Sequence, residues 1–185
     1  MTYALLAIGV LILYVILIYN GLVNLKNKTE SAWADIDTQL KRRYDLIPNL
    51  VETVKGYAKH EAGTLEKVTQ MRTAAMGAKS LPERNKAENA LSEGLKSIFA
   101  LAENYPDLKA NQNFLDLQEE LSSVEEEISL ARRYYNANVR ELNTKIEVFP
   151  NKLIAGPFGF TKREFFEASE EERKNVKVDF SDMGK

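Results

Sequence analysis

Residues 33–75, WADIDTQLKRRYDLIPNLVETVKGYAKHEAGTLEKVTQMRTAA, carry a seven-residue repeat that decides the interpretation of the whole chain. One series of positions is Trp33, Leu40, Ile47, Val54, Glu61, Val68 and Ala75. A second series, three residues on, is Ile36, Arg43, Leu50, Tyr57, Thr64 and Met71. Two mainly apolar positions in every seven are typical of a long helix that packs along other helices. Arg43, Glu61 and Thr64 are the polar exceptions.

Pro48 lies inside this stretch and allows two interpretations. A proline within a helix removes one hydrogen bond and kinks the helix. Alternatively, Asp45 caps a new helix and Pro48 occupies its first turn. The spacing of seven from Leu40 to Ile47 is unbroken across the proline, and a chain that turned back would have no reason to keep it. We therefore predict one long, kinked helix that continues to about Met76.

Residues 1–25 contain no charged side chain and are almost entirely apolar. A stretch from residue 3 to residue 25 is long enough to cross a hydrocarbon core of ~30 Å, with Tyr3 and Tyr19 near its two ends. A cleaved signal peptide would need a basic start and a processing site, and the stretch has neither. We predict a single-pass anchor in the plasma (inner) membrane that contacts the lipid bilayer through residues 3–25. Lys26 and Lys28 follow it and favour a cytoplasmic location for the remaining chain.

Two further helices are predicted beyond residue 79. Ser80 and Glu83 form a capping box at the start of one, which ends before Pro106. The last helix begins at Asp107 or Asn111 and ends at Pro150. Its core positions are seven apart: Phe114, Leu121, Ile128, Tyr135, Leu142 and Phe149. No segment alternates with period two, so no strand is expected.

The predicted fold class is therefore all-α, an N-terminal transmembrane helix followed by an antiparallel up-and-down bundle of long helices. Three parts are expected: the anchor at residues 1–25, the bundle at residues 26–150, and an irregular tail at residues 151–185. A short charged helix is expected within the tail at residues 167–174. The density of phenylalanine in the tail predicts that it docks on the bundle.

Composition excludes several classes of function. The formal net charge of −2 gives no reason to expect nucleic acid as a partner. The chain has no cysteine, which excludes disulfides and thiolate chemistry. Its single histidine, His60, leaves no pair of carboxylate–histidine motifs for a metal site in a bundle. Phosphate-binding loops and nucleophile elbows are absent. We expect no cofactor, no metal and no enzymatic activity.

Four charged residues at or beside the packing positions are the candidate site: Arg43, Glu61, Glu125 and Arg132. A buried charge is tolerated only when it is paired and hydrogen-bonded. The first interpretation is a structural polar network that sets the register of the helices. The alternative is a ligand or proton site inside the bundle.

The chain resembles the LemA family along essentially its whole length. The resemblance rests on the segments Gln39-Leu40-Lys41-Arg42-Arg43, Asp45-Leu46-Ile47-Pro48-Asn49-Leu50-Val51, Val54-Lys55-Gly56-Tyr57-Ala58, Tyr105-Pro106-Asp107-Leu108-Lys109-Ala110-Asn111, Leu117-Gln118 with Glu120-Leu121, Ala131-Arg132, Tyr135-Asn136, Phe149-Pro150, Gly159-Phe160 and Phe165-Phe166-Glu167. It implies a bacterial-type membrane protein with one anchor and a four-helix up-and-down domain, in which the long first helix counts as one or two elements. It assigns no catalytic activity.

These observations predict a membrane-anchored, non-catalytic helical-bundle protein that acts as a scaffold or adaptor in membrane or envelope organisation. Its expected partners are other membrane or envelope proteins, and self-association through the anchor or an exposed face of the bundle is a further expectation. The rival interpretation is a sensor or ligand-binding module that uses the polar residues in the bundle interior.

Overall fold

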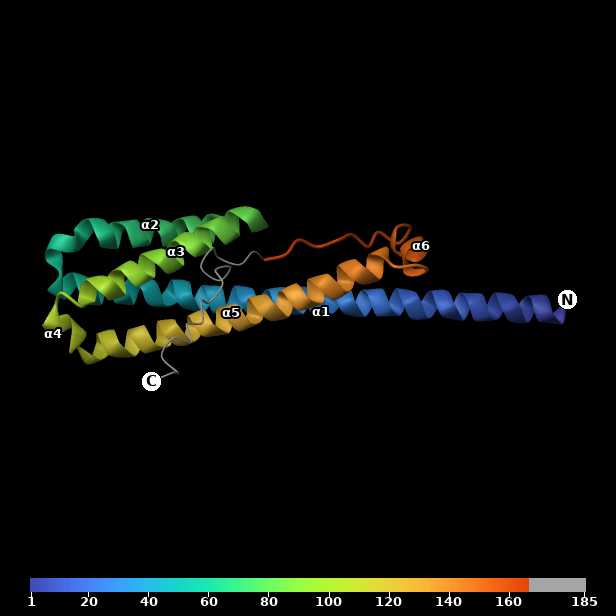
Figure 1. The fold of residues 1–185 in the computed structure, drawn as a ribbon, viewed down its shortest axis with the longest axis horizontal. Helices are drawn as coiled ribbons and strands as arrows, with labels where there is room; N and C mark the ends of the chain where they lie inside the picture. Colours follow the sequence, from blue (N-terminus) through green and yellow to red (C-terminus); the bar gives the residue numbers. More distant parts are fainter. Residues whose placement is uncertain (167–185) are drawn as a thin grey trace, which may run out of the picture.

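The computed structural model describes residues 1–166, and all regular structure within this range is helical. The elements are α1 (Thr2–Tyr57), a 3-10 turn η1 (Lys59–Glu61), α2 (Ala62–Gly77), α3 (Leu81–Ala102), α4 (Pro106–Lys109), α5 (Gln112–Glu147) and α6 (Asn151–Ala155). Figure 1 shows α1 running the length of the molecule, with α2, α3 and α5 alongside its C-terminal part in alternating directions. The predicted all-α bundle is confirmed.

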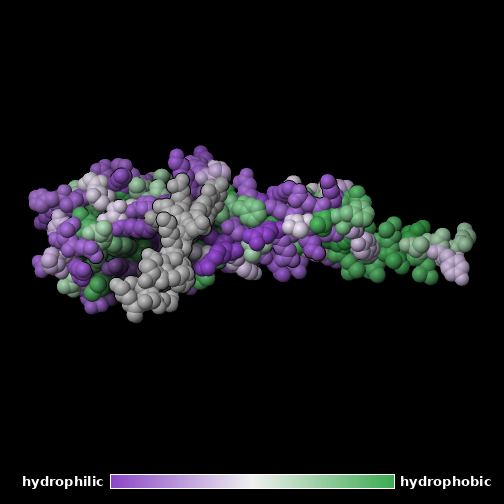
Figure 2. Space-filling model, viewed as in Figure 1, coloured by the Kyte–Doolittle hydropathy of each residue, from purple (hydrophilic) through white to green (hydrophobic). Residues whose placement is uncertain are grey.

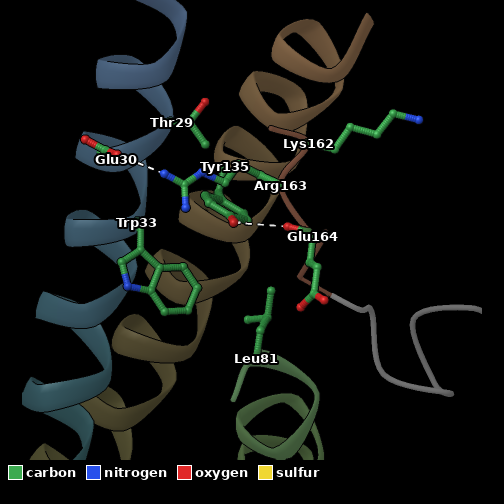
Figure 3. A pocket seen from close by; sticks show the side chains of 8 residues that line it. All are labelled: Thr29, Glu30, Trp33, Leu81, Tyr135, Lys162, Arg163 and Glu164. Atoms are coloured by element: carbon green, nitrogen blue, oxygen red, sulfur yellow. Dashed lines mark hydrogen bonds and ion pairs between the residues drawn. The ribbon is translucent and has the colours of Figure 1, made fainter. Parts of the chain in front are cut away.

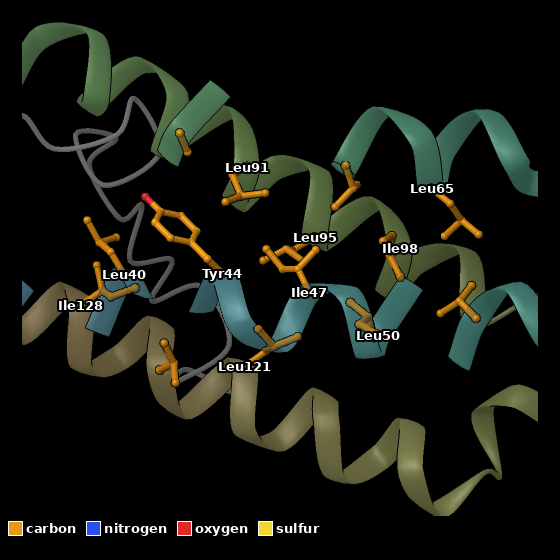
Figure 4. Close-up of a cluster of buried hydrophobic side chains, with 14 of the residues drawn as sticks. Leu40, Tyr44, Ile47, Leu50, Leu65, Leu91, Leu95, Ile98, Leu121 and Ile128 are labelled. Atoms are coloured by element: carbon orange, nitrogen blue, oxygen red, sulfur yellow. The ribbon is translucent and has the colours of Figure 1, made fainter. Parts of the chain in front are cut away.

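The seven-residue repeat forms the centre of the core. In α1 five of its apolar positions are almost fully buried, namely Ile36, Leu40, Ile47, Leu50 and Val54, whereas Trp33 is partly buried and Tyr57, at the end of the helix, is 43% exposed. The buried side chains pack with apolar side chains of α3 and α5, as Figure 4 shows. The central buried residues are Leu40, Ile47, Leu50, Leu91, Ile98, Leu121 and Ile128. Removing this apolar surface from water is the main source of stability for such a bundle.

The prediction of one helix to about Met76 is wrong, because α1 ends at Tyr57. Ala58 has φ −115° and ψ 57°, which is outside the helical region, and η1 turns the chain back into α2. Gly56 and Gly63 lie on either side of the break, and glycine lowers helix stability. Since any amphipathic helix repeats close to every seven residues, the register continued into α2 although the chain had reversed.

Helix α1 does continue through Pro48, as predicted. A proline has no N–H, so the carbonyl of Tyr44, four residues earlier, loses its helical donor. Arg72 of α2 replaces that donor, since its Nε donates a hydrogen bond of 2.7 Å to the Tyr44 carbonyl oxygen. Because of the proline, the Tyr44 carbonyl of α1 is free to accept a hydrogen bond from α2.

Two predicted helix starts are confirmed by their caps. The Ser80 hydroxyl accepts a hydrogen bond of 3.3 Å from the Glu83 N–H at the start of α3. The Asn111 side chain accepts one of 3.1 Å from the Phe114 N–H at the start of α5. Each cap satisfies one of the N–H groups that a helix start leaves without a partner. The loops between these helices are short, which makes consecutive helices neighbours in the bundle.

The N-terminal part of α1 projects beyond the bundle (Figure 1). By its length and composition α1 is able to cross a membrane. None of residues 1–21 is buried, and burial begins at Leu22. Figure 2 shows this projecting part as mostly hydrophobic surface, whereas the bundle is mostly hydrophilic outside. The exposed apolar surface therefore stops where the rest of the protein starts to cover α1.

The segment after α5 contains the short helix α6, where the sequence predicted irregular structure. Beyond α6 the chain runs back along α5, held by two asparagines. The Asn143 amide exchanges two hydrogen bonds of 2.9 Å with the backbone of Arg163. Asn136 does the same with Phe166, at 2.8 Å. The charged helix expected at residues 167–174 lies outside the described residues.

Candidate functional site

Arg43 is the centre of a charged cluster inside the bundle. Its guanidinium, fully buried, forms an ion pair with Glu88 of α3 and another, at 2.5 Å, with Glu125 of α5. Ser92 links the two carboxylate-bearing helices, because it accepts a hydrogen bond from Arg43 and donates one to Glu125 at 3.1 Å. The cluster therefore joins three helices at one level of the core.

Glu88 is as completely buried as Arg43. It accepts a second hydrogen bond, from the hydroxyl of Tyr44. Burial, and then the hydrogen bond to Glu88, raises the pKa of Tyr44 above its ordinary value, so the phenol remains protonated and donating. A buried carboxylate with two strong donors is well compensated, whereas the same carboxylate without them would be costly.

The structure joins only two of the four predicted site residues. Arg43 and Glu125 are in contact, whereas Glu61 lies in η1 and accepts a hydrogen bond of 3.3 Å from the hydroxyl of Tyr105. The Arg132 guanidinium carbon lies 4.4 Å from the ring centre of Phe166. Glu61 was assigned to the core stripe on the assumption of a continuous helix, and the break at Ala58 removes that assumption.

Sequence reasoning missed Glu88, Ser92 and Tyr44. The signal for Glu88 was present: it lies three, seven and ten residues before the buried Leu91, Leu95 and Ile98. The sequence analysis did not consider Glu88 as a packing residue, because a glutamate is ordinarily found at the surface. Tyr44 and Ser92 have no comparable signal, because a position beside the stripe is equally suited to solvent.

A cavity of about 500 Å³ opens between α1, α5 and the segment after α6 (Figure 3). Trp33 and Tyr135 line it, with ring centres 5.4 Å apart. Arg163 crosses its upper part to reach Glu30 at 3.0 Å, and the Tyr135 hydroxyl donates to the Glu164 carbonyl at 3.0 Å. Burial raises the pKa of Tyr135. These groups hold the returning segment in place.

The polar groups of the Arg43 cluster are bonded mainly to one another. In the Arg43 cluster both ion pairs and the hydroxyls satisfy one another, and among residues 1–166 only the Nε of Arg43 lacks a partner there. Within the same residues no three histidine, aspartate or glutamate side chains are grouped to hold a metal ion. The arrangement is a largely buried polar network that joins three helices.

Comparison with known proteins gives a consistent set of relatives. The model of the LemA family matches residues 32–180. Protein LemA of Metamycoplasma hominis is 32% identical over 168 residues, covering 89% of this chain and 74% of that protein. Magnetosome proteins MamQ 1 and MamQ 2 of Paramagnetospirillum magneticum are each 22% identical over 175 residues, covering 80% of this chain and 64% of theirs.

Proposed function

Because the chain belongs to the LemA family, with its helical bundle attached to an apolar N-terminal helix, we propose that it is a non-catalytic membrane scaffold or adaptor. In this function the N-terminal part of α1 is embedded in the bilayer. The bundle then presents its polar outer faces to other membrane or envelope proteins.

The observation that carries the proposal is the continuity of α1. The exposed apolar residues and the buried core positions belong to one helix, with no loop between them. A flexible linker would let a domain turn freely, whereas an unbroken helix holds it at a fixed distance and direction. Fixed presentation is what a scaffold needs from its anchor.

The side of the membrane is part of the proposal. Lys26 and Lys28 follow the apolar stretch directly, and no basic side chain precedes it. The positive-inside rule then assigns the bundle to the cytoplasm. A reporter fused after Lys185 that is active only in the cytoplasm should give signal, and signal from a reporter active only outside would reverse the assignment.

Two relatives are named magnetosome proteins, which supports a role at a defined cellular structure. The alternative of a ligand-binding module has less support, since the charges of the Arg43 cluster are bonded to one another. Replacing Glu125, the partly exposed carboxylate of that cluster, by Gln distinguishes the two. A structural role predicts lower stability, and a ligand site predicts lost binding in a domain that folds normally.

In vivo crosslinking followed by purification in mild detergent tests the scaffold role. The full chain should retrieve the same small set of membrane proteins in repeated experiments. A variant without residues 2–18 is the matched control, because it keeps the bundle and loses the apolar stretch; its yield of these partners should fall sharply. Recovery of the full chain alone, without any reproducible partner, would contradict the proposal.

A further inference from the structure

We infer that residues 148–160, here named the α6 platform, form a second membrane contact that lies in the headgroup region of an anionic bilayer beside the anchor. The inference rests on the proposed insertion of α1 and adds a surface to it. The platform comprises the residues directly after α5, helix α6 and the loop that follows. It would fix how deep the anchor lies and how the bundle is oriented to the membrane.

The first argument is position. Tyr19 of α1 contacts the platform through two rings, with its ring centre 5.0 Å from that of Phe158 and 5.7 Å from that of Phe160. Tyr19 lies near the end of the exposed apolar stretch of residues 1–21, about where a hydrocarbon core of ~30 Å would end. Aromatic side chains favour that interface. The platform is thus level with the membrane surface.

The second argument is exposure. Phe149 is 81% exposed, Leu153 is 66% exposed and Phe158 is 57% exposed, all within ten residues of one another. Single exposed apolar side chains are ordinary, but three large ones on one short segment mark a contact surface. This surface is next to the exposed apolar part of α1, so one bilayer would cover both.

The third argument is charge. Lys26 lines one cavity with Tyr19 and Phe158, and it pairs with Glu30 at 4.0 Å. Lys152 belongs to the platform, Lys28 lies two residues after Lys26, and within residues 1–166 neither of them forms an ion pair. Two acids of this region, Glu147 and Glu30, are already paired with Lys162 and Arg163, so they do not offset the positive charge of Lys28 and Lys152. Lysines at a membrane surface attract anionic headgroups over about a Debye length.

A smaller cavity lies at the same place. It has a volume of about 300 Å³ between α1 and the platform, and Tyr19, Lys26, Phe158 and Arg163 are among the residues that line it. Aromatic walls with two basic side chains suit the glycerol and phosphate part of a lipid. A second copy of the chain would also cover apolar side chains, but it would not explain their place beside a membrane-crossing helix.

Depth measurement with single labels tests the inference, and the absence of cysteine makes the labelling specific. The full chain is reconstituted into vesicles of phosphatidylcholine and phosphatidylglycerol at a ratio of three to one. An environment-sensitive fluorophore is attached in turn to the variants Leu153→Cys, Leu11→Cys and Leu115→Cys. Leu115 is the matched control, an exposed leucine in the first turn of α5 at the opposite end of the bundle. Quenchers are placed on lipids at shallow or deep positions.

The label at Leu153 should be quenched several-fold more by the shallow quencher than by the deep one, and the label at Leu115 by neither. Quenching at Leu153 should weaken when phosphatidylglycerol is omitted. The label at Leu11 reports the anchor separately, and it should respond to the deep quencher.

If Leu11 is quenched and Leu153 is not, the platform inference is overturned and the anchor stands. If Leu11 is not quenched, the proposed anchor itself fails. A blue-shifted but unquenched label at Leu153 would show a protein occupant and would also overturn the inference.

Discussion

At the scale of single residues, the Arg43–Glu88 pair is the point where one change has the largest consequence. Both side chains are fully buried, so removing one leaves the other as an uncompensated charge. Arg43→Leu should therefore lower the free energy of unfolding by about 3–5 kcal/mol. Urea unfolding of the full chain in mild detergent, followed by far-UV circular dichroism, measures it.

The neighbouring Arg42 provides the control. It pairs with Glu120 at 2.9 Å, but both side chains are largely exposed, and such pairs contribute at most about 1 kcal/mol. Arg42→Leu should cost correspondingly little. Arg43→Leu combined with Glu88→Leu should recover part of the loss, because no buried charge is left without its partner. Equal effects for Arg42→Leu and Arg43→Leu would contradict a buried network.

The raised pKa of Tyr44 makes a prediction about pH. The protonated phenol is favoured in the folded state, so its contribution is complete below the ordinary tyrosine pKa of about 10 and is lost as the pH rises above it. At pH 7, Tyr44→Phe should cost about 1–3 kcal/mol through the donor lost to Glu88. This difference should shrink above pH 10, by up to about 1.4 kcal/mol per pH unit. Tyr134→Phe, at an exposed tyrosine, should leave the pH profile unchanged.

At the scale of elements, the sequence predicted every long helix correctly except at the break after α1. Caps and prolines are local signals, so the starts of α3 and α5 could be read directly. The break at Ala58 could not, because its only local marks were two glycines and a polar position in the repeat. The unbroken seven-residue spacing correctly predicted that α1 continues through Pro48. The same spacing could not reveal the reversal of the chain at Ala58, because the spacing continues into α2.

The contact between Pro48 and α2 is a prediction at this scale. Arg72 donates to the Tyr44 carbonyl because Pro48 supplies no N–H. Arg72→Met should therefore destabilise the protein by about 1–3 kcal/mol, through an acceptor left without a donor. In a Pro48→Ala background the alanine N–H restores the helical bond, and the same change should cost much less. A double-mutant cycle on urea unfolding should give a coupling of at least about 0.5 kcal/mol. Strict additivity would show that Arg72 acts elsewhere.

At the scale of the whole molecule, the sequence predicted the apolar stretch at the N-terminus but wrongly assigned Phe149 to the core, since α5 ends at Glu147 and the Phe149 side chain is 81% exposed. The anchor stretch was visible from its lack of charge. The position of α6 beside Tyr19 depends on the path that the chain takes after Pro150. The side chains of Asn136 and Asn143 determine that path through their hydrogen bonds to the backbone of Phe166 and Arg163. The Arg43 cluster was predicted only in part, because Glu125 was proposed as a member whereas Glu88 was not considered.

Removing residues 2–18 separates the two proposed membrane contacts, the N-terminal part of α1 and the α6 platform. None of these residues is buried, and Tyr19 is kept, so the bundle should unfold at the same urea concentration within about 0.5 kcal/mol of free energy. The full chain should stay in the membrane fraction after washing with 1 M salt, at which the Debye length is only about 3 Å. The shortened chain should remain on anionic vesicles at low salt, through the α6 platform, and leave them in the salt wash. Release at low salt would mean that the anchor alone holds the protein, and resistance to the wash would mean that the bundle binds the membrane by a contact other than charge.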